Sequence, residues 1–291
     1  MSVSASSPAE IPAAPRRRRR RSALPGFGLS FGLTAFYLGL IILLPIAALL
    51  LKAGSLSPSE FWAVISSRRA VSTYRLTLSS ALYATIFNAL LGFLLAWILT
   101  RYEFRGRRVL DALIDLPFAL PTAVAGIALT TLLSRNGAIG QWLEPLGLKI
   151  AYAQPGIVIA MAFTSLPFVV RTVQPVLEEL ETEVEEAGHI LGANDWQLFS
   201  RVIWPAVLPA FLSGASLAFA RSLGEFGAVV FIAGNLPNRT EITALLTLIR
   251  IEEYDYPGAA ALAAVILASS FVMLFVVNAI QLWQLRYVRR S

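Results

Sequence analysis

Six long apolar runs divide this sequence, and each is close to the length of a membrane-spanning helix. A helix needs about 20 mostly apolar residues to cross the hydrocarbon core of a bilayer. Of the 291 residues, 56% are hydrophobic and only 14% are charged, which is too little charge for an ordinary soluble domain. The sequence therefore predicts an all-α polytopic membrane protein with six transmembrane helices. The runs cover approximately residues 27–51, 76–99, 110–133, 156–173, 206–233 and 258–283.

Residues 1–22 are rich in Ser, Pro and Ala and end in the arginine run Arg16–Arg21. This composition predicts a disordered basic tail, followed by a transmembrane domain over residues 23–291. The run either contacts anionic lipid head groups or acts as a topology signal. Together with the loop RYEFRGRR at residues 101–108, it predicts cytoplasmic N- and C-termini. This topology accounts for the net charge of +6, so no nucleic-acid partner is expected.

The composition excludes several kinds of catalytic and metal site. The chain has no cysteine and one histidine, so thiol chemistry and multi-histidine metal clusters are excluded. Neither lysine, Lys52 or Lys149, follows a glycine, so the chain lacks the phosphate-binding P-loop motif. We therefore expect no catalytic residues, no cofactor, no metal and no ATP hydrolysis by this chain.

A polar segment at residues 174–205 interrupts the apolar pattern between the fourth and fifth runs. Pro175 suits the first turn of a helix, and Gly192 suits the position just after its end. Asn194 is typical of the N-cap of a second helix, which would carry Trp196, Phe199 and Ile203 on one face. The apolar face of the first helix would consist of Leu177, Leu180, Val184, Ala187 and Leu191. The pair either docks in a partner's groove or lies on the protein's own base.

This segment resembles the cytoplasmic loop of ABC importer permeases, which reads EAA, three residues, G, and later an apolar residue, Leu and Pro. The matching positions are Glu186, Ala187, Gly188, Gly192 and Pro205, with Val202 as the apolar residue. Gly188 stands where the family has a second alanine, and Trp204 stands where leucine is usual. The resemblance implies that residues 174–205 couple the pore to an ATP-hydrolysing partner subunit.

Four further segments narrow the resemblance to the sulfate and molybdate branch of these permeases. They are residues 115–132, 165–180, 220–235 and 240–263, and the last is similar to the T-type permeases of sulfate/thiosulfate importers. The resemblance implies a type I (MetI-like) importer permease fold, with its core at about residues 73–283. It implies import of sulfate or thiosulfate by alternating access in the bacterial inner membrane. Molybdate or tungstate import is the alternative.

The partners are also implied by the resemblance. They are an ATP-binding subunit in two copies, a homologous W-type permease and a periplasmic sulfate/thiosulfate-binding protein, within a lipid bilayer. Two other classes remain open from the residues alone. A membrane-embedded enzyme would be active without partners, and a secondary transporter or channel would work without ATP.

Polar residues within the apolar runs are candidates for a translocation path or gate. Arg221 and Glu225 are four residues apart and share a helix face, where they form either an anion site or an internal ion pair. Pro121 frees backbone groups beside Thr122, and Ser165 lies two residues before Pro167 in the fourth run. These breaks either line an anion path or simply bend the helices.

Asp111 and Asp115 begin the third run close to three arginines. We expect them to form an interfacial salt-bridge cluster rather than an acid–base pair. The expected partners are Arg105, Arg107 and Arg108.

Overall fold

The structure of the protein is a computed structural model that describes residues 27–180 and 182–288. Regular structure in these ranges is helical throughout. The chain divides into two compact units, residues 1–47 and 48–291. The described part of the first unit belongs to helix α1 (Phe27–Ala53), whose side chains are almost all exposed, as on a lipid-facing helix. The predicted tail at residues 1–22 lies outside the described residues.

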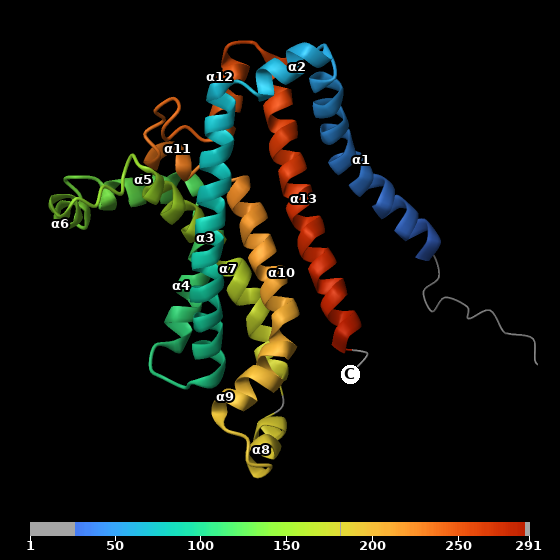
Figure 1. The fold of residues 1–291 in the computed structure, drawn as a ribbon, viewed down its shortest axis with the longest axis vertical. Coiled ribbons are helices and arrows are strands. Elements are labelled where there is room, and N and C mark those ends of the chain that lie inside the picture. Colours follow the sequence, from blue (N-terminus) through green and yellow to red (C-terminus); the bar gives the residue numbers. More distant parts are fainter. Residues whose placement is uncertain (1–26, 181, 289–291) are drawn as a thin grey trace, which may run out of the picture. The chain divides into compact units, whose positions relative to one another are not determined.

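Three helices form the centre of the second unit: α3 (Arg68–Arg101), α7 (Gln154–Glu179) and α10 (Trp204–Leu223). Val169 of α7 lies between two glycines of its neighbours. A Cβ atom on Gly92 would lie 2.8 Å from the Val169 Cβ, and one on Gly214 would lie 3.0 Å from the Val169 Cα. These glycines therefore allow the close helix approach that is typical of membrane bundles. Helix α13 (Tyr256–Val288) packs against α10 (Figure 1).

Five described helices are long and apolar enough to span a membrane, and a bent pair makes up to six. The pair is α4 (Arg107–Ala119) and α5 (Thr122–Leu133), and the chain bends by 113° between them. The predicted third span is therefore not one continuous helix. Pro121 explains the break, because it holds Leu120 in extended backbone and has no N–H to donate. Pro117 stays within α4.

The fifth span is shorter than predicted. Helix α10 ends at Leu223, and α11 (Val229–Ile232) follows after a turn, so residues 206–233 do not form one helix. Gly224 follows the last helical residue. The Ala228 N–H donates to the Glu225 carboxylate, which caps the start of α11. The turn therefore places a buried carboxylate where the sequence predicted continuous helix.

Short helices connect the spans at the two ends of the second unit. Helices α2 (Pro58–Ile65) and α12 (Thr243–Glu252) lie at one end, and α8 (Thr182–Ile190) and α9 (Asp195–Leu198) lie at the other (Figure 1). Helix α6 (Gly140–Leu143) and the 3₁₀ turn η1 (Glu144–Leu146) connect α5 to α7.

Helix α2 begins with a capping box formed by Ser57 and Glu60. The Ser57 hydroxyl donates to the carboxylate of Glu60, and so does the Ser57 backbone N–H. These hydrogen bonds hold the pKa of Glu60 below its usual value.

Candidate functional site

The polar segment begins later than the sequence predicts. Helix α7 continues to Glu179, so Pro175 lies inside it rather than in the first turn of a separate helix. Leu177 is 1% exposed and packs in the core below the segment, where it cannot belong to a free apolar face. Packing of this last turn extends α7, and the chain breaks at Leu180, which has extended backbone.

The turn between α8 and α9 follows the prediction. Gly192 has φ +87°, the left-handed conformation that favours glycine. The Gly192 N–H donates to the His189 carbonyl, and the Ala193 N–H donates to the Gly188 carbonyl, which completes a Schellman motif. Asn194 then forms a capping box with Gln197 at the start of α9. The predicted glycine turn and N-cap are both confirmed.

Helix α9 does not stand apart from the fifth span. A π-helical turn, η2 (Phe199–Ile203), joins it directly to α10, and Pro205 lies in the first turn of α10. A π-turn accommodates the missing N–H of Pro205 within a continuous helical path. The helical path from Asp195 to Leu223 is therefore nearly continuous.

Two neighbouring carboxylates of α8 have different surroundings. Glu185 pairs with Arg101 at the end of α3, and the Arg101 guanidinium carbon lies 5.5 Å from the Trp97 ring centroid. Glu186 is exposed and, within the part of the chain described here, has no ion-pair partner. The sequence singled out Glu186 but missed Glu185, because no local spacing connects Glu185 with Arg101.

The surface around Glu186 is apolar as well as acidic. Ile190 is 85% exposed and Leu191 is 87% exposed. Ala187, which follows Glu186 in the sequence, is also exposed. Gly188 faces inward: a Cβ there would lie 2.8 Å from Leu198 Cδ1. The atom that a Cβ would meet is the flexible end of Leu198, so the alanine that the related loops have at this position would need only a small shift of that side chain.

An aromatic groove lies beside this segment, with a volume of about 700 Å³. Phe93 and Trp97 of α3 form one wall, and Phe199 forms another, with a centroid distance of 5.9 Å between the Trp97 and Phe199 rings. The carboxylates of Glu185 and Asp195 also line the groove. An apolar surface therefore continues from α8 to α3, with Asp195 and the ion-paired Glu185 at its edge.

Arg221 and Glu225 form an internal ion pair, which is one of the two alternatives that their spacing allows. Arg221 Nη1 lies 2.6 Å from Glu225 Oε2, and the Glu225 side chain is 1% exposed. The other carboxylate oxygen accepts the Ala228 N–H at 2.8 Å. Glu225 thus connects the end of α10 to the start of α11 and cancels the charge of Arg221.

A chain of buried neutral groups lies next to this pair. Asn88 Nδ2 donates to the Ser165 hydroxyl at 2.8 Å, and the Ser222 hydroxyl donates to it at 3.0 Å. Thr122 reaches the same segment from α5, since a Cβ on Gly227 would lie 2.2 Å from the Thr122 hydroxyl. The structure therefore brings Ser165 and Thr122 to the region of Arg221 and Glu225. Asn88 was missed, although a lone amide in an apolar run is itself a signal.

Asp111 and Asp115 pair with a different arginine from those predicted. Arg171 of α7 donates through Nε and Nη2 to Asp115 at 2.8 and 2.6 Å, and through Nη1 to Asp111 at 2.7 Å. The expected cluster with Arg105, Arg107 and Arg108 is therefore wrong. The two aspartates share one face of α4, and this face packs against α7 rather than toward the loop.

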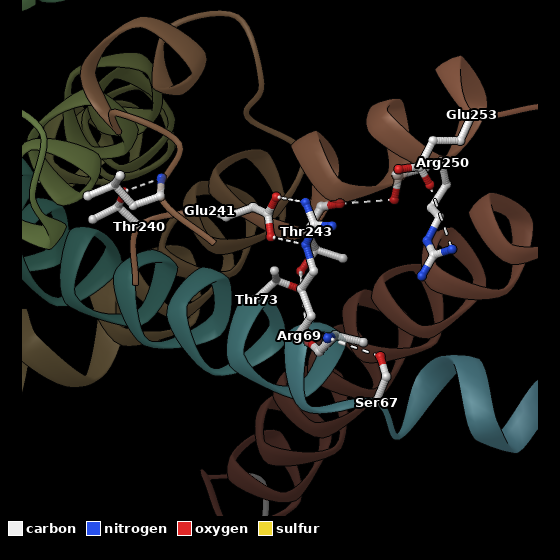
Figure 2. A network of polar contacts seen from close by, with 11 residues as sticks. Ser67, Arg69, Thr73, Thr240, Glu241, Thr243, Arg250 and Glu253 are labelled. Atoms are coloured by element: carbon white, nitrogen blue, oxygen red, sulfur yellow. Dashed lines mark hydrogen bonds and ion pairs between the residues drawn. The ribbon is translucent and has the colours of Figure 1, made fainter. Parts of the chain in front are cut away.

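A second buried carboxylate lies at the α12 end of the unit (Figure 2). Glu241 is 2% exposed and binds Arg69 through both oxygens, at 2.8 and 2.6 Å. The Thr243 N–H donates to the Thr77 hydroxyl at 3.0 Å, and the Thr243 hydroxyl donates to Thr73 at 3.4 Å. This network fastens the start of α12 to the start of α3.

In residues 27–180 and 182–288, no group of three or more His, Asp or Glu side chains could hold a metal ion. The polar groups of this site consist of ion pairs, neutral donors and the exposed carboxylate of Glu186. Such groups can bind, orient or release an ion, or change partners between two conformations.

Residues 88–290 match the family described as binding-protein-dependent transport system inner membrane component. The chain belongs to this family.

Two similar proteins of known name belong to a narrower class than this family, the permeases of sulfate transport systems. The sulfate transport system permease protein CysT of Escherichia coli (strain K12) is 54% identical over 261 residues, which cover 90% of this chain and 94% of the relative. CysT of Synechocystis sp. is 46% identical over 272 residues, which cover 94% of this chain and 95% of the relative.

Solved structures share the fold at low identity. A chain of a bacterial ABC transporter involved in import of the acidic polysaccharide alginate has a TM-score of 0.71 at 14% identity, covering 88% of this chain and 95% of that one. A chain of the MetNI methionine ABC transporter, in an inward-facing conformation, has a TM-score of 0.58 at 17% identity and covers 79% of this chain and 99% of that one. The predicted importer permease fold is confirmed.

Proposed function

We propose that this chain is the permease subunit of an ATP-driven importer that moves sulfate, and with it thiosulfate, into the cytoplasm. The observation that carries the proposal is identity of 54% and 46% to sulfate permeases across nine-tenths of the chain. Those relatives favour sulfate over the molybdate alternative. Separate subunits would supply ATP hydrolysis, a second W-type permease and a periplasmic binding protein.

The segment at residues 180–205 is the proposed coupling loop. Its exposed Glu186, Ile190 and Leu191 offer a carboxylate and an apolar surface to a groove with basic edges. Gly192 fixes the turn, and η2 connects the loop to α10 without a break. Closure of two ATPase copies would then move α10 and the Arg221–Glu225 pair at its far end. On this proposal the loop, and the C-terminal end of α13, face the cytoplasm.

The segment around residues 221–228 is the proposed gate. Arg221 is neutralised by Glu225 in this conformation, so it offers no free charge to an anion. If a second conformation exchanges these partners, the guanidinium becomes available to a divalent oxyanion. Ser165, Thr122 and the backbone freed beside Pro121 are the proposed neutral donors along the path.

Sulfate uptake tests the substrate. Cells lacking the gene, and having no other sulfate importer, should lose uptake of radiolabelled sulfate and regain it when the gene is restored. Excess thiosulfate should block the restored uptake, whereas trace molybdate should not. Uptake that persists after deletion, or that only molybdate blocks, would overturn the assignment.

Reversal of the charge at Glu186 tests the coupling loop. The variant Glu186→Arg should insert normally and keep its thermal stability, because Glu186 is exposed and lacks an ion-pair partner among the described residues. It should lose most ATP-driven uptake, because the charge would be wrong for a basic groove. Uptake at the wild-type rate would contradict the proposed docking.

A further inference from the structure

A small hollow lies at the end of α7 that is opposite the α8 loop. It has a volume of about 140 Å³ and is lined by side chains from the connection between α5 and α7, including Arg135, Glu144, Lys149 and Tyr152. A second hollow of about 370 Å³ shares Arg135 and Glu144. Since α7 has 26 residues, helix rise separates the hollow from the α8 loop by about 39 Å. If that loop is cytoplasmic, the hollow is on the outer side.

The walls of the hollow are held by backbone contacts. The Ile139 N–H donates to the Leu132 carbonyl at 3.0 Å, and the Leu148 N–H donates to the Leu143 carbonyl at 3.1 Å. Gly140 packs so closely that a Cβ would lie 1.9 Å from the Ser134 carbonyl oxygen. The connection between α5 and α7 is therefore held by its own hydrogen bonds and packing, and these define the shape of the hollow.

Within residues 27–180 and 182–288, no side chain neutralises the charges that line the hollow. Among the described residues, the side chains of Arg135, Lys149 and Glu144 have neither an ion-pair nor a hydrogen-bond partner. Arg69 and Arg250, at the α12 end, are paired with carboxylates. Two free cations and one carboxylate leave the hollow net positive. A guanidinium fork and an ammonium are the donors that bind tetrahedral oxyanions.

The hollow is also connected to the proposed gate. The Tyr152 N–H donates to the Ile232 carbonyl at 2.8 Å, at the end of α11. Gly234 packs on the same residue, since a Cβ there would lie 2.9 Å from the Tyr152 Cβ. Helix α11 begins next to Ala228, whose N–H binds Glu225. One four-residue helix therefore separates the hollow from the Arg221–Glu225 pair.

We propose that Arg135 and Lys149 form an outer binding site for a tetrahedral oxyanion. The volume of about 140 Å³ holds a few groups of water size, at about 30 Å³ each, so a small hydrated anion fits. The imported anion and a lipid phosphate head group share this chemistry, and the proposal assigns the site to the imported anion. Glu144 weakens binding by repulsion, which keeps the anion able to leave. This inference rests on the proposed function.

The absence of cysteine from the chain gives a direct test. Leu148 lines the hollow and is 56% exposed, so Leu148→Cys places one thiol at its mouth. The full-length chain, assembled with its partner subunits, is labelled on this thiol with an anionic and with a neutral thiol reagent at constant ionic strength. The rate with the anionic reagent divided by the rate with the neutral reagent measures the local electrostatic potential. Slower labelling in the presence of added sulfate measures occupancy of the site by sulfate.

The charge variants are expected to shift the labelling ratio in opposite directions. Arg135→Gln or Lys149→Gln should lower it by about fivefold each, the effect of one unit charge at about 4 Å in water. Both should abolish protection by sulfate, whereas Glu144→Gln should raise the ratio and strengthen protection. Arg68→Gln is the matched control, since Arg68 is an exposed cation at the α12 end that lines neither hollow. It should change nothing.

The outcomes separate the inference from the function on which it rests. Protection by sulfate in detergent and in bilayers of zwitterionic lipid supports the site. Protection by anionic phospholipid alone, or a ratio that ignores Arg135 and Lys149, overturns it. Sulfate uptake by the wild-type importer is measured in parallel. If uptake is intact but sulfate does not protect the thiol, only the proposed outer site is refuted. If uptake is absent, the proposed function is refuted.

Discussion

Helices α12 and α8 both connect membrane-spanning helices, yet the protein fixes them in opposite ways. Helix α12 is preceded by Glu241, a buried carboxylate that binds Arg69 through both oxygens. Helix α8 is held by the ion pair of Glu185 with Arg101, and it leaves Ile190 and Leu191 exposed. The polar groups at the α12 end are therefore buried and paired within the bundle, whereas the α8 end presents exposed apolar side chains.

The difference follows from where each polar group finds its partner. At α12 the carboxylate and the threonine hydroxyls form their hydrogen bonds within the chain, so they need no further hydrogen bonds from a partner protein. At α8 the backbone groups of the turn are satisfied locally, while Glu186 has no ion-pair partner among the described residues. Local order with unsatisfied side chains suits a segment that docks elsewhere.

The largest effect is expected from breaking the α12 network. Arg69→Met leaves Glu241 buried without its cation, which should lower the free energy of unfolding by about 3 kcal/mol. The thermal unfolding midpoint of the purified importer measures this loss. Adding Glu241→Gln should recover much of it, because the uncompensated charge is gone. Arg68→Met, at the exposed neighbour, should leave the midpoint unchanged, and an equal fall there would refute the explanation.

A smaller and local effect is expected at the α8 turn. Gly192→Ala places a Cβ in open space but at φ +87°, a backbone strain of about 1–2 kcal/mol. Backbone amides of the turn should exchange hydrogen about tenfold faster, while the global unfolding midpoint barely moves. Gly188→Ala, a helical glycine in the same turn, meets only the flexible end of Leu198 and should exchange more nearly like wild type. Equal exchange in both variants would contradict the backbone explanation.

The smallest effect compares the two adjacent carboxylates of α8. Glu185→Gln removes a partly buried ion pair with Arg101 and should cost about 1 kcal/mol or less. Glu186→Gln should leave stability unchanged and reduce only ATP-driven uptake. Unfolding and uptake measured on both variants test the distinction, which fails if Glu186→Gln is the less stable of the two.

Much of the fold could be predicted because its signals are local. The apolar runs gave the approximate positions of the spans, and the spacing of Arg221 and Glu225 put both residues on one helix face, where the structure contains an ion pair. Gly192 and Asn194 marked the turn because capping acts within a few residues. Pro121 signalled a break, although its bend of 113° depends on what α5 packs against.

The partners of the remaining charges were decided by tertiary structure alone. Arg171 binds aspartates 56 and 60 residues away, and Arg69 binds Glu241 across 172 residues. A sequence shows that such a charge needs a partner, because a lone charge in the membrane is costly. It does not show which carboxylate packing brings within reach. Hence the sequence by itself determined the approximate positions of the spans, the caps and the turn. The packed bundle extended α7, chose the ion pairs and left Glu186 exposed and, among the described residues, unpaired.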